Sequence, residues 1–259
     1  MGVHRHELWR KDSAGEPYRL RRSFPAGPAS ATTLLAGPGS VSALDGGGRD
    51  DLLLGRLTDR LVGAGRQVLQ CDMPVRNPQV PFTEKEFDAR VERLDHLLRG
   101  NRHLMTGPLT LVGFSLGGLA LLELLESGSP PRADRVVLVG TVLEEDVFLS
   151  SRVPTVELVY GSRDLIGYLI EDTSDSGANP QPIVFDPGMY ADWSARHVIG
   201  SPTPEVNVHL LEGLGHTLHP VGPGPGRDPL PELTSLVGTG PLTTHRPTAR
   251  QERLRDARE

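Results

Sequence analysis

The stretch LTLVGFSLGGLALLELLES, residues 109–127, changes character at Ser115. Residues 109–114 form a short apolar run typical of a buried strand, and the leucine-rich run after Ser115 is long enough for a helix. Gly113 and Gly117 bracket the serine in the spacing G-x-S-x-G. A direct turn from strand to helix forces the corner residue into a sparsely populated backbone conformation and requires small neighbours. The pattern therefore predicts an exposed serine hydroxyl beside a helix N-terminus.

A serine hydroxyl is a poor nucleophile at neutral pH and needs a base that is itself held by a third group. Among the nine histidines, His216 lies in the glycine-rich LLEGLGHTLHP, residues 210–220, directly after the last predicted strand. Asp164 follows the preceding strand in VELVYGSRDLIG, residues 156–167. His219 is the alternative base. The alternative acids are Glu144, Glu145 and Asp146, which follow an earlier strand.

The rest of the chain alternates strand-like and helix-like segments. Continuous Val/Leu-rich runs, typical of strands covered on both faces, occupy residues 31–37, 66–73, 109–114, 135–140, 154–161 and 205–213. Helical patterns occupy residues 51–62, 83–98, the run after Ser115, and 231–237, and TEKE at residues 83–86 is typical of a capping box. HELWRKD and YRLRRSF flank the turn-like SAGEP at residues 13–17 and indicate an antiparallel hairpin. We therefore predict a three-layer α/β fold with a mostly parallel sheet, an N-terminal hairpin and helices on both faces.

The motifs GFSLGG, YGSRD and GLGH, in this order and each after a strand, resemble those of the α/β-hydrolase superfamily over about residues 31–219. The resemblance implies that Ser115 is the nucleophile, Asp164 the orienting acid and His216 the general base. It also implies an oxyanion hole made by the backbone N–H groups of Leu116 and, in LLAGPGS at residues 34–40, of Gly37. This loop has Leu35 and Ala36 where the family usually has His and Gly.

Two segments are candidates for the walls of a substrate pocket. The link between the strands that end near residue 140 and begin near 154 is too short for a large lid domain, whereas residues 165–204 exceed what one crossover requires. We therefore expect residues 165–204 to be a pocket-covering insertion, with Met189, Tyr190 and Trp193 facing the substrate. Arg76, in CDMPVRNP at residues 71–78, is a candidate contact for an anionic group.

Composition narrows the classes of function. The formal net charge of −6 gives no basic field for a nucleic acid, and no stretch approaches the roughly 18 apolar residues of a membrane span. Cys71 is the single cysteine, so no intramolecular disulfide and no cysteine-based metal site can form. We expect a cytoplasmic protein without cofactor or metal. Residues 1–237 are predicted to form one domain and residues 238–259, which are poor in apolar side chains, a mobile tail.

These features predict a serine hydrolase that cleaves an ester, thioester or related acyl bond of a small molecule through an acyl-enzyme. Two alternatives stay open. The same triad serves lyase, cyclase and acyl-transfer reactions, and the altered LLAGPGS loop favours that possibility. The other alternative is a binding or receptor module in which the triad is vestigial.

Overall fold

The computed structural model describes residues 2–39, 49–74, 83–127, 130–143, 146–150, 153–164, 168–171, 182–185, 187–201, 203–222 and 227–238. Arg76, Glu144, Glu145 and the predicted tail beyond residue 238 lie outside the described residues. None of the described helices is both long enough and apolar enough to cross a membrane.

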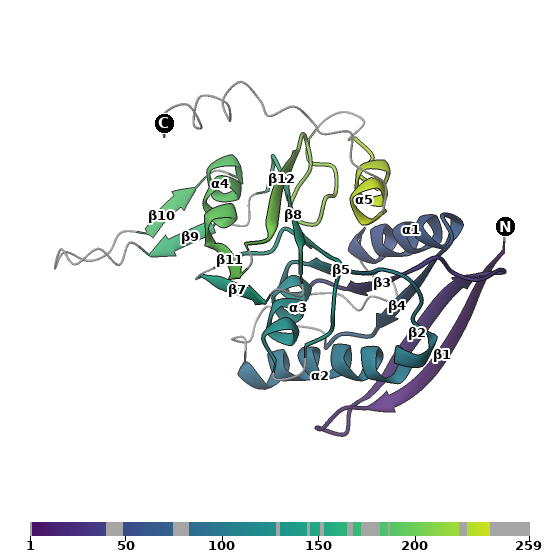
Figure 1. Cartoon of the computed structure of the whole chain (residues 1–259). Coiled ribbons are helices and arrows are strands. Elements are labelled where there is room, and N and C mark those ends of the chain that lie inside the picture. The colour runs from purple at the N-terminus through teal and green to yellow at the C-terminus, as the bar shows by residue number, and fades with distance from the viewer. Residues whose placement is uncertain are drawn as a thin grey trace.

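An eight-stranded sheet forms the centre of the molecule (Figure 1). The strand order across it is β1 (Val3–Lys11), β2 (Pro17–Pro25), β4 (Arg66–Cys71), β3 (Ala31–Ala36), β5 (Leu109–Phe114), β6 (Arg135–Val139), β8 (Thr155–Gly161) and β12 (Glu205–Leu211). β1 pairs antiparallel with β2, and β2 pairs antiparallel with β4. From β4 to β12 every pair is parallel. The carboxyl ends of these parallel strands therefore meet along one edge of the sheet.

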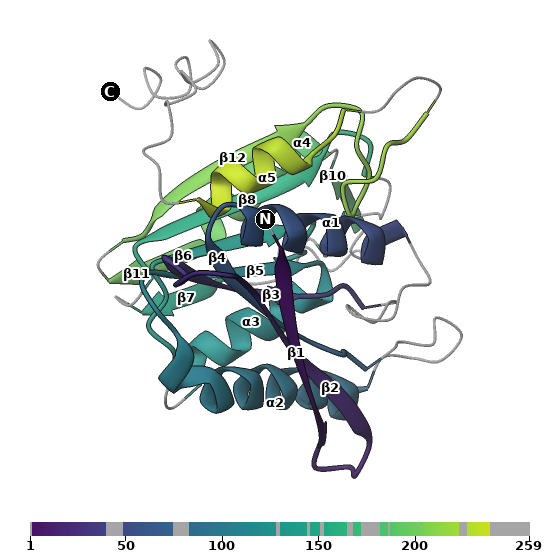
Figure 2. The same ribbon diagram turned by 90° about the vertical axis from the view of Figure 1, so that its right-hand side faces the viewer.

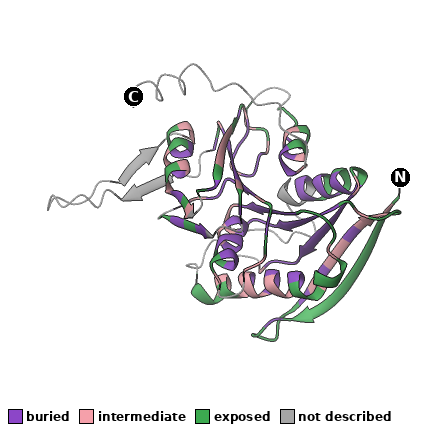
Figure 3. Ribbon diagram, viewed as in Figure 1, coloured by how far each residue is buried: buried purple, intermediate pink, exposed green. Residues whose placement is uncertain are grey.

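Helices cover both faces of the sheet (Figures 1 and 2). One face carries α1 (Arg49–Gly63) and α5 (Leu230–Val237), and the other carries α2 (Glu84–Asn101), α3 (Leu116–Glu126) and α4 (Pro187–His197). A short 3₁₀ turn, η1 (Arg102–Leu104), follows α2. β3, β4 and β5 are buried along their whole length, whereas β1 at the sheet edge is largely exposed (Figure 3).

Strand alternation divides the core in two. In β5, Leu109 and Leu111 pack with the cluster under α2, α3 and α4, whereas Val112 and Phe114 pack with the cluster under α1 and α5. A strand covered on both faces needs apolar side chains at nearly every position, because successive side chains point to opposite sides. This explains why the strands appear in the sequence as continuous Val/Leu runs.

The predicted architecture is confirmed. The six predicted strands and the N-terminal hairpin are present, and Thr83 and Glu86 form the capping box at the start of α2. The segment between β8 and β12 contains elements that we did not predict: β9 (Tyr168–Glu171) pairs antiparallel with β10 (Pro182–Phe185), and β11 (Val198–Ser201) pairs with β7 (Val147–Ser150). α4 lies between them and packs on β8 and β12 as the crossover helix that two parallel neighbours require.

Polar side chains form a buried or half-buried row on the α5 side of the sheet. This polar belt consists of Arg66, Thr110, Arg135, Glu157 and His209. Arg66 Nη2 donates to Thr110 Oγ1 at 3.0 Å, Arg135 Nη1 lies 3.4 Å from Glu157 Oε1, and Glu157 Oε2 lies 2.9 Å from His209 Nε2. Arg135 also donates to the carbonyl of Leu236, which fastens the end of α5 to the sheet. Burial and the nearby Arg135 lower the pKa of Arg66 to about 10.

Candidate active site

Ser115 occupies the corner between β5 and α3. Its backbone has φ 51° and ψ −122°, and Leu218 is the other non-glycine residue with positive φ among the described residues. The Ser115 N–H donates to Val139 O on the neighbouring strand at 2.7 Å, and its carbonyl accepts from Gly118 N at 2.8 Å. The corner is thus held on both sides in a conformation that non-glycine residues rarely adopt. Such over-determined strain is a common property of functional sites.

The glycines around Ser115 allow a close approach of backbone to backbone. A Cβ atom at Gly113 would lie 2.4 Å from the Cα of Gly118 on the first turn of α3. A Cβ atom at Gly117 would lie 2.3 Å from the carbonyl oxygen of Gly37, in the loop after β3. The two glycines of the G-x-S-x-G motif are therefore required for two reasons: the sharp turn at Ser115, and the close backbone contacts with α3 and with the loop after β3.

The side chains of Ser115, His216 and Asp164 form one hydrogen-bonded chain. Ser115 Oγ lies 2.8 Å from His216 Nε2, and His216 Nδ1 lies 2.9 Å from Asp164 Oδ2. The Asp164 carboxylate is fully buried, the His216 side chain is 11% exposed, and Ser115 is half-buried. The chain therefore runs from a half-buried serine to a fully buried carboxylate.

Main-chain contacts between two loops place the acid and the histidine opposite each other. In the loop after β8, Ser162 N donates to Leu211 O and Arg163 N donates to Leu214 O, at 2.9 and 2.8 Å. The Ser162 hydroxyl accepts from Gly213 N at 2.9 Å. Since β8 and β12 are parallel neighbours, their loops leave the same edge of the sheet and lie side by side. Asp164 and His216 thus meet because of the topology.

Thr141 contacts the backbone of Ser115, a position that we did not predict from the sequence. Its hydroxyl lies 3.4 Å from the carbonyl of Ser115, and its own carbonyl accepts a hydrogen bond from the Tyr160 hydroxyl at 3.1 Å. Burial raises the pKa of Tyr160, so this hydroxyl stays protonated and available as a donor. Thr141 follows Gly140 at the carboxyl end of β6, which is the signal that could have indicated it.

The arrangement supports proton transfer from the serine. A carboxylate at Nδ1 favours the imidazole tautomer that carries its proton there, which leaves the Nε2 lone pair directed at the serine hydroxyl. Leu116 begins α3, so its N–H belongs to the first turn, where helical N–H groups have no partner within the helix and the dipole favours negative charge. Gly37 lies against this turn through its contact with Gly117. The role of these two N–H groups as an oxyanion hole stays a prediction.

Comparisons with known proteins identify the architecture. No protein-family model matches the sequence, and no curated protein matches it. Among solved structures, an α/β serine hydrolase homologue from Coxiella burnetii aligns with a TM-score of 0.57 at 15% identity, over 90% of this chain and 95% of that one. An α/β serine hydrolase without lid from Xanthomonas campestris aligns with a TM-score of 0.58 at 15% identity, over 90% and 91% of the two chains. The chain has the α/β-hydrolase fold.

A dienelactone hydrolase from Anabaena variabilis shares this α/β-hydrolase fold, with a TM-score of 0.57 at 15% identity over 90% of this chain and 94% of that one. We predicted that the link between β6 and β8 is too short for a large lid domain. Here residues 140–154 link β6 directly to β8, with room only for β7. The predicted lack of a large lid is confirmed, in line with the likeness to the Xanthomonas enzyme.

The structure distinguishes the predicted triad residues from some of their alternatives. His219 Nδ1 lies 3.3 Å from the Thr217 hydroxyl, so the structure brings His216, and not His219, to Ser115. Asp146 pairs with His197 Nδ1 at 2.7 Å, and Glu144 and Glu145 lie outside the described residues. Among the described residues, no group of three or more His, Cys, Asp or Glu side chains could hold a metal ion.

The predicted pocket residues have different environments. Tyr190 is fully buried; its hydroxyl accepts from Leu143 N, donates to Leu143 O at 3.1 Å, and its ring packs edge-on against Tyr160. This differs from the expected pocket wall, because Tyr190 belongs to the crossover helix α4 and packs in the core. Trp193 is half-buried, stacks on Tyr190 and lies with its ring tilted against His197, whereas Met189 is 49% exposed. Pocket roles for Trp193 and Met189 stay predictions, and the side chains of residues 165–186 lie outside the description.

Proposed function

We propose that this protein is a serine hydrolase that cleaves an ester, thioester or related acyl bond of a small molecule through an acyl-enzyme. The observation that carries the proposal is the continuous chain from Ser115 Oγ through His216 to the buried Asp164, with successive distances of 2.8 and 2.9 Å. Serine hydrolases, esterases and a dienelactone hydrolase among its structural neighbours support the same class of reaction.

In the proposed mechanism, Ser115 Oγ attacks the acyl carbon while His216 Nε2 takes the hydroxyl proton. The carbonyl oxygen becomes an oxyanion that accepts from the N–H groups of Leu116 and Gly37. The tetrahedral adduct collapses, the bond to the alcohol or thiol breaks, and the leaving group takes the proton from His216. Water then repeats the sequence on the acyl-enzyme, with His216 again as base, and releases the acid and the free serine.

Asp164 has two tasks in this scheme. It holds the imidazole in the orientation and tautomer that the serine requires, and its negative charge stabilises the imidazolium that forms in each half-reaction. Its complete burial keeps water from competing for the Nδ1 proton. We also propose that the exposed Met189 and the half-buried Trp193 contact the acyl group, and that Arg76 binds an anionic one.

A panel of acyl esters and thioesters of increasing chain length tests the proposal, with wild type beside Ser115→Ala and an exposed control, Ser13→Ala. Wild type and Ser13→Ala should turn over at least one class of substrate and should react with a fluorophosphonate probe. Ser115→Ala should lose turnover by several orders of magnitude and all labelling, because triad residues act as a unit. Full turnover in Ser115→Ala would refute the mechanism. Labelling of Ser115 without hydrolysis of any substrate would favour a lyase, cyclase or acyl transferase instead.

A further inference from the structure

Arg90 of α2 is among the largest fully buried side chains of the molecule, with 1% of its surface exposed. It lies on the apolar stripe of the helix, between Phe87 and Leu94, rather than on the solvent face. A guanidinium carries five N–H donors and cannot lose its charge in a protein, so burial is costly unless acceptors surround it. The position of Arg90 therefore needs an explanation in terms of what it binds.

Arg90 binds the backbone of two loops at the carboxyl edge of the sheet. Nη2 donates to Gly39 O at 2.9 Å and to Pro74 O, and Nη1 donates to Pro38 O at 3.5 Å. Pro38 and Gly39 follow β3, and Pro74 follows β4. One guanidinium thus joins both loops to α2. The sequence alone does not show which backbone carbonyls accept these hydrogen bonds.

The loop after β3 is the one that lies against the nucleophile corner. The carbonyl of Gly37 lies so close to Gly117 that a Cβ atom there would be 2.3 Å away, and a Cβ atom at Gly39 would lie 3.2 Å from Leu116 Cδ2. Residues 37–39, the described part of this loop, are Gly, Pro and Gly, so they have no polar side chain that could fasten them. Arg90 supplies polar contacts from outside the loop.

We propose that Arg90 is a positioning residue for the oxyanion hole: it holds residues 37–39 against α3, so that the Gly37 and Leu116 N–H groups converge on one point. The proposal rests on the function proposed above. A guanidinium suits this task because its planar fork can donate to several carbonyls at once, whereas the ammonium of lysine acts as a point donor on a flexible stem.

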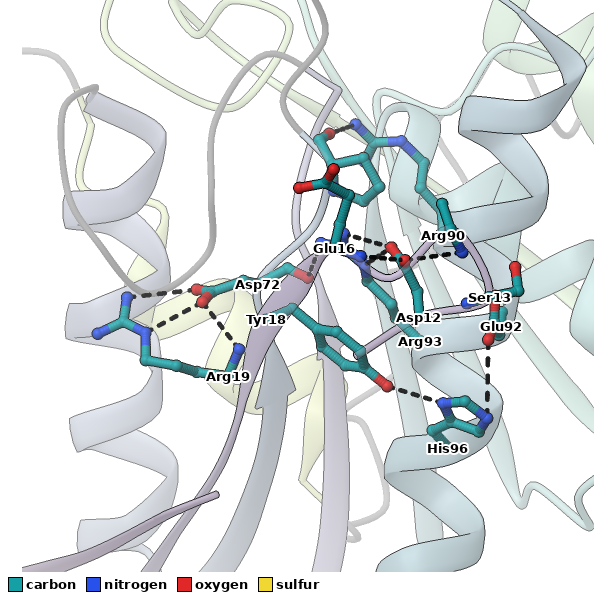
Figure 4. A network of polar contacts seen from close by, with 12 residues as sticks. Asp12, Ser13, Glu16, Tyr18, Arg19, Asp72, Arg90, Glu92, Arg93 and His96 are labelled. Carbon is teal, nitrogen blue, oxygen red and sulfur yellow. Dashed lines mark hydrogen bonds and ion pairs between the residues drawn. The ribbon is translucent and has the colours of Figure 1, made fainter. Parts of the chain in front are cut away.

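Arg93, one turn further along α2, offers a matched control (Figure 4). It is nearly as buried, with 6% of its surface exposed, and it also joins separate segments. Its Nη2 donates to Asp12 Oδ2 at 2.7 Å, its Nη1 donates to Asp72 O at 3.0 Å, and the guanidinium lies over the Tyr18 ring. Arg93 therefore fastens the hairpin turn between β1 and β2 and the start of the loop after β4, without a contact to residues 37–39 among those described.

The test compares Arg90→Lys and Arg90→Met with Arg93→Lys and Arg93→Met, on the best ester of the panel. Loss of one oxyanion donor lowers kcat by about 100- to 1,000-fold, so a donor that is displaced rather than removed should cost about 10- to 100-fold. We expect this fall in kcat for the Arg90 variants, with KM within about threefold of wild type because the ground state makes little use of the oxyanion hole. The inhibition constant of a trifluoromethyl ketone, which forms a tetrahedral adduct with the serine, should rise by the same factor.

A second measurement is independent of turnover. Amide hydrogen exchange at Gly37 and Gly39 should become faster in the Arg90 variants and stay unchanged in the Arg93 variants. Arg90→Lys keeps the charge and most of the volume of the side chain. If Arg90→Met does not fold, the measurements are made on Arg90→Lys. All four substitutions should lower the melting temperature, so a loss of stability alone does not count in favour of the proposal.

The outcomes separate this inference from the function on which it rests. Equal kcat losses in the Arg90 and Arg93 variants, or unchanged inhibitor binding and exchange in the Arg90 variants, would overturn the positioning role. Full activity in Ser115→Ala would instead refute the serine-hydrolase mechanism, and the exchange rates at Gly37 and Gly39 would then decide by themselves whether Arg90 holds the loop.

Discussion

Gly140→Ala should displace His216, the proposed general base, without replacing any residue of the proposed triad. Gly140 follows β6 with φ +56°, and an added Cβ atom would lie 2.3 Å from the carbonyl oxygen of His216 and 3.2 Å from its Nδ1. The Gly140 N–H donates to Val159 O at 2.8 Å, which fixes this residue to the sheet. The loop that carries His216 is therefore the side that must move.

The size of the effect follows from these distances. Cβ atoms in proteins essentially never lie closer than 3.0 Å to a non-bonded heavy atom. The added Cβ atom would lie 2.3 Å from the His216 carbonyl oxygen, so this oxygen must move away by at least about 0.7 Å. A shift of that size lengthens the 2.8 Å bond between His216 Nε2 and Ser115 Oγ beyond the normal range. Misplacement of a catalytic group by about 1 Å can cost about 100-fold in rate. We expect kcat to fall by about 10- to 100-fold.

Gly213→Ala is the control for the backbone conformation. Gly213 lies in the same loop as His216 and has φ +76°, but an added Cβ atom meets nothing within 4 Å. Both variants should lose about 1–2 kcal/mol of stability from the left-handed conformation, which is measurable by chemical denaturation. Only Gly140→Ala should lose kcat and the rate of fluorophosphonate labelling. Wild-type kcat in Gly140→Ala, or equal losses of kcat in the two variants, would refute the reasoning.

Two further predictions concern single side chains. Asp164→Asn should lower kcat by about four orders of magnitude because the amide permits the wrong histidine tautomer, whereas Asp146→Asn should change kcat by less than about twofold; the reverse ranking in steady-state kinetics would move the acid to Asp146. Burial raises the pKa of Cys71 to about 12, so the folded protein disfavours the thiolate: the contribution to stability is complete below the usual thiol pKa near 9 and is lost as the pH rises toward 12. Urea denaturation at pH 8 and pH 10.5 should therefore show a smaller loss in Cys71→Val than in wild type, and an equal loss would contradict the assignment.

Much of the fold could be predicted because its determinants are local. The apolar run before Ser115 and the leucines after it specify a strand and a helix whatever surrounds them, and the capping box at Thr83 places the start of α2 to within a residue. Asp164 and His216 could be chosen because each follows a strand, and loops after parallel strands share one edge. For these two residues, the position in the chain directly after a parallel strand also gives their position in space.

The features that were missed depend on contacts between distant segments. We predicted a pocket wall from the surplus length of residues 165–204 and from the Met and aromatic residues in this segment, yet Tyr190 is a core residue of the crossover helix. Arg90 lies on an apolar stripe, which signals burial, but its acceptors at Pro38, Gly39 and Pro74 come from loops elsewhere in the chain. A position on the apolar face of a helix shows that the side chain is buried, but it does not show which groups from distant segments the side chain contacts.

The polar belt on the α5 side of the sheet has a consequence for the fidelity of folding. Side chains alternate between the two faces, so a slip of β8 by one residue would carry Glu157 away from Arg135 and His209 and into the apolar cluster beneath α4. An uncompensated carboxylate there would cost several kcal/mol, comparable with the whole stability of a marginal domain. Val, Leu and Ile would tolerate such a slip because each suits either cluster. The few charges of the belt therefore let the chain distinguish the correct strand pairing from near-identical misaligned ones.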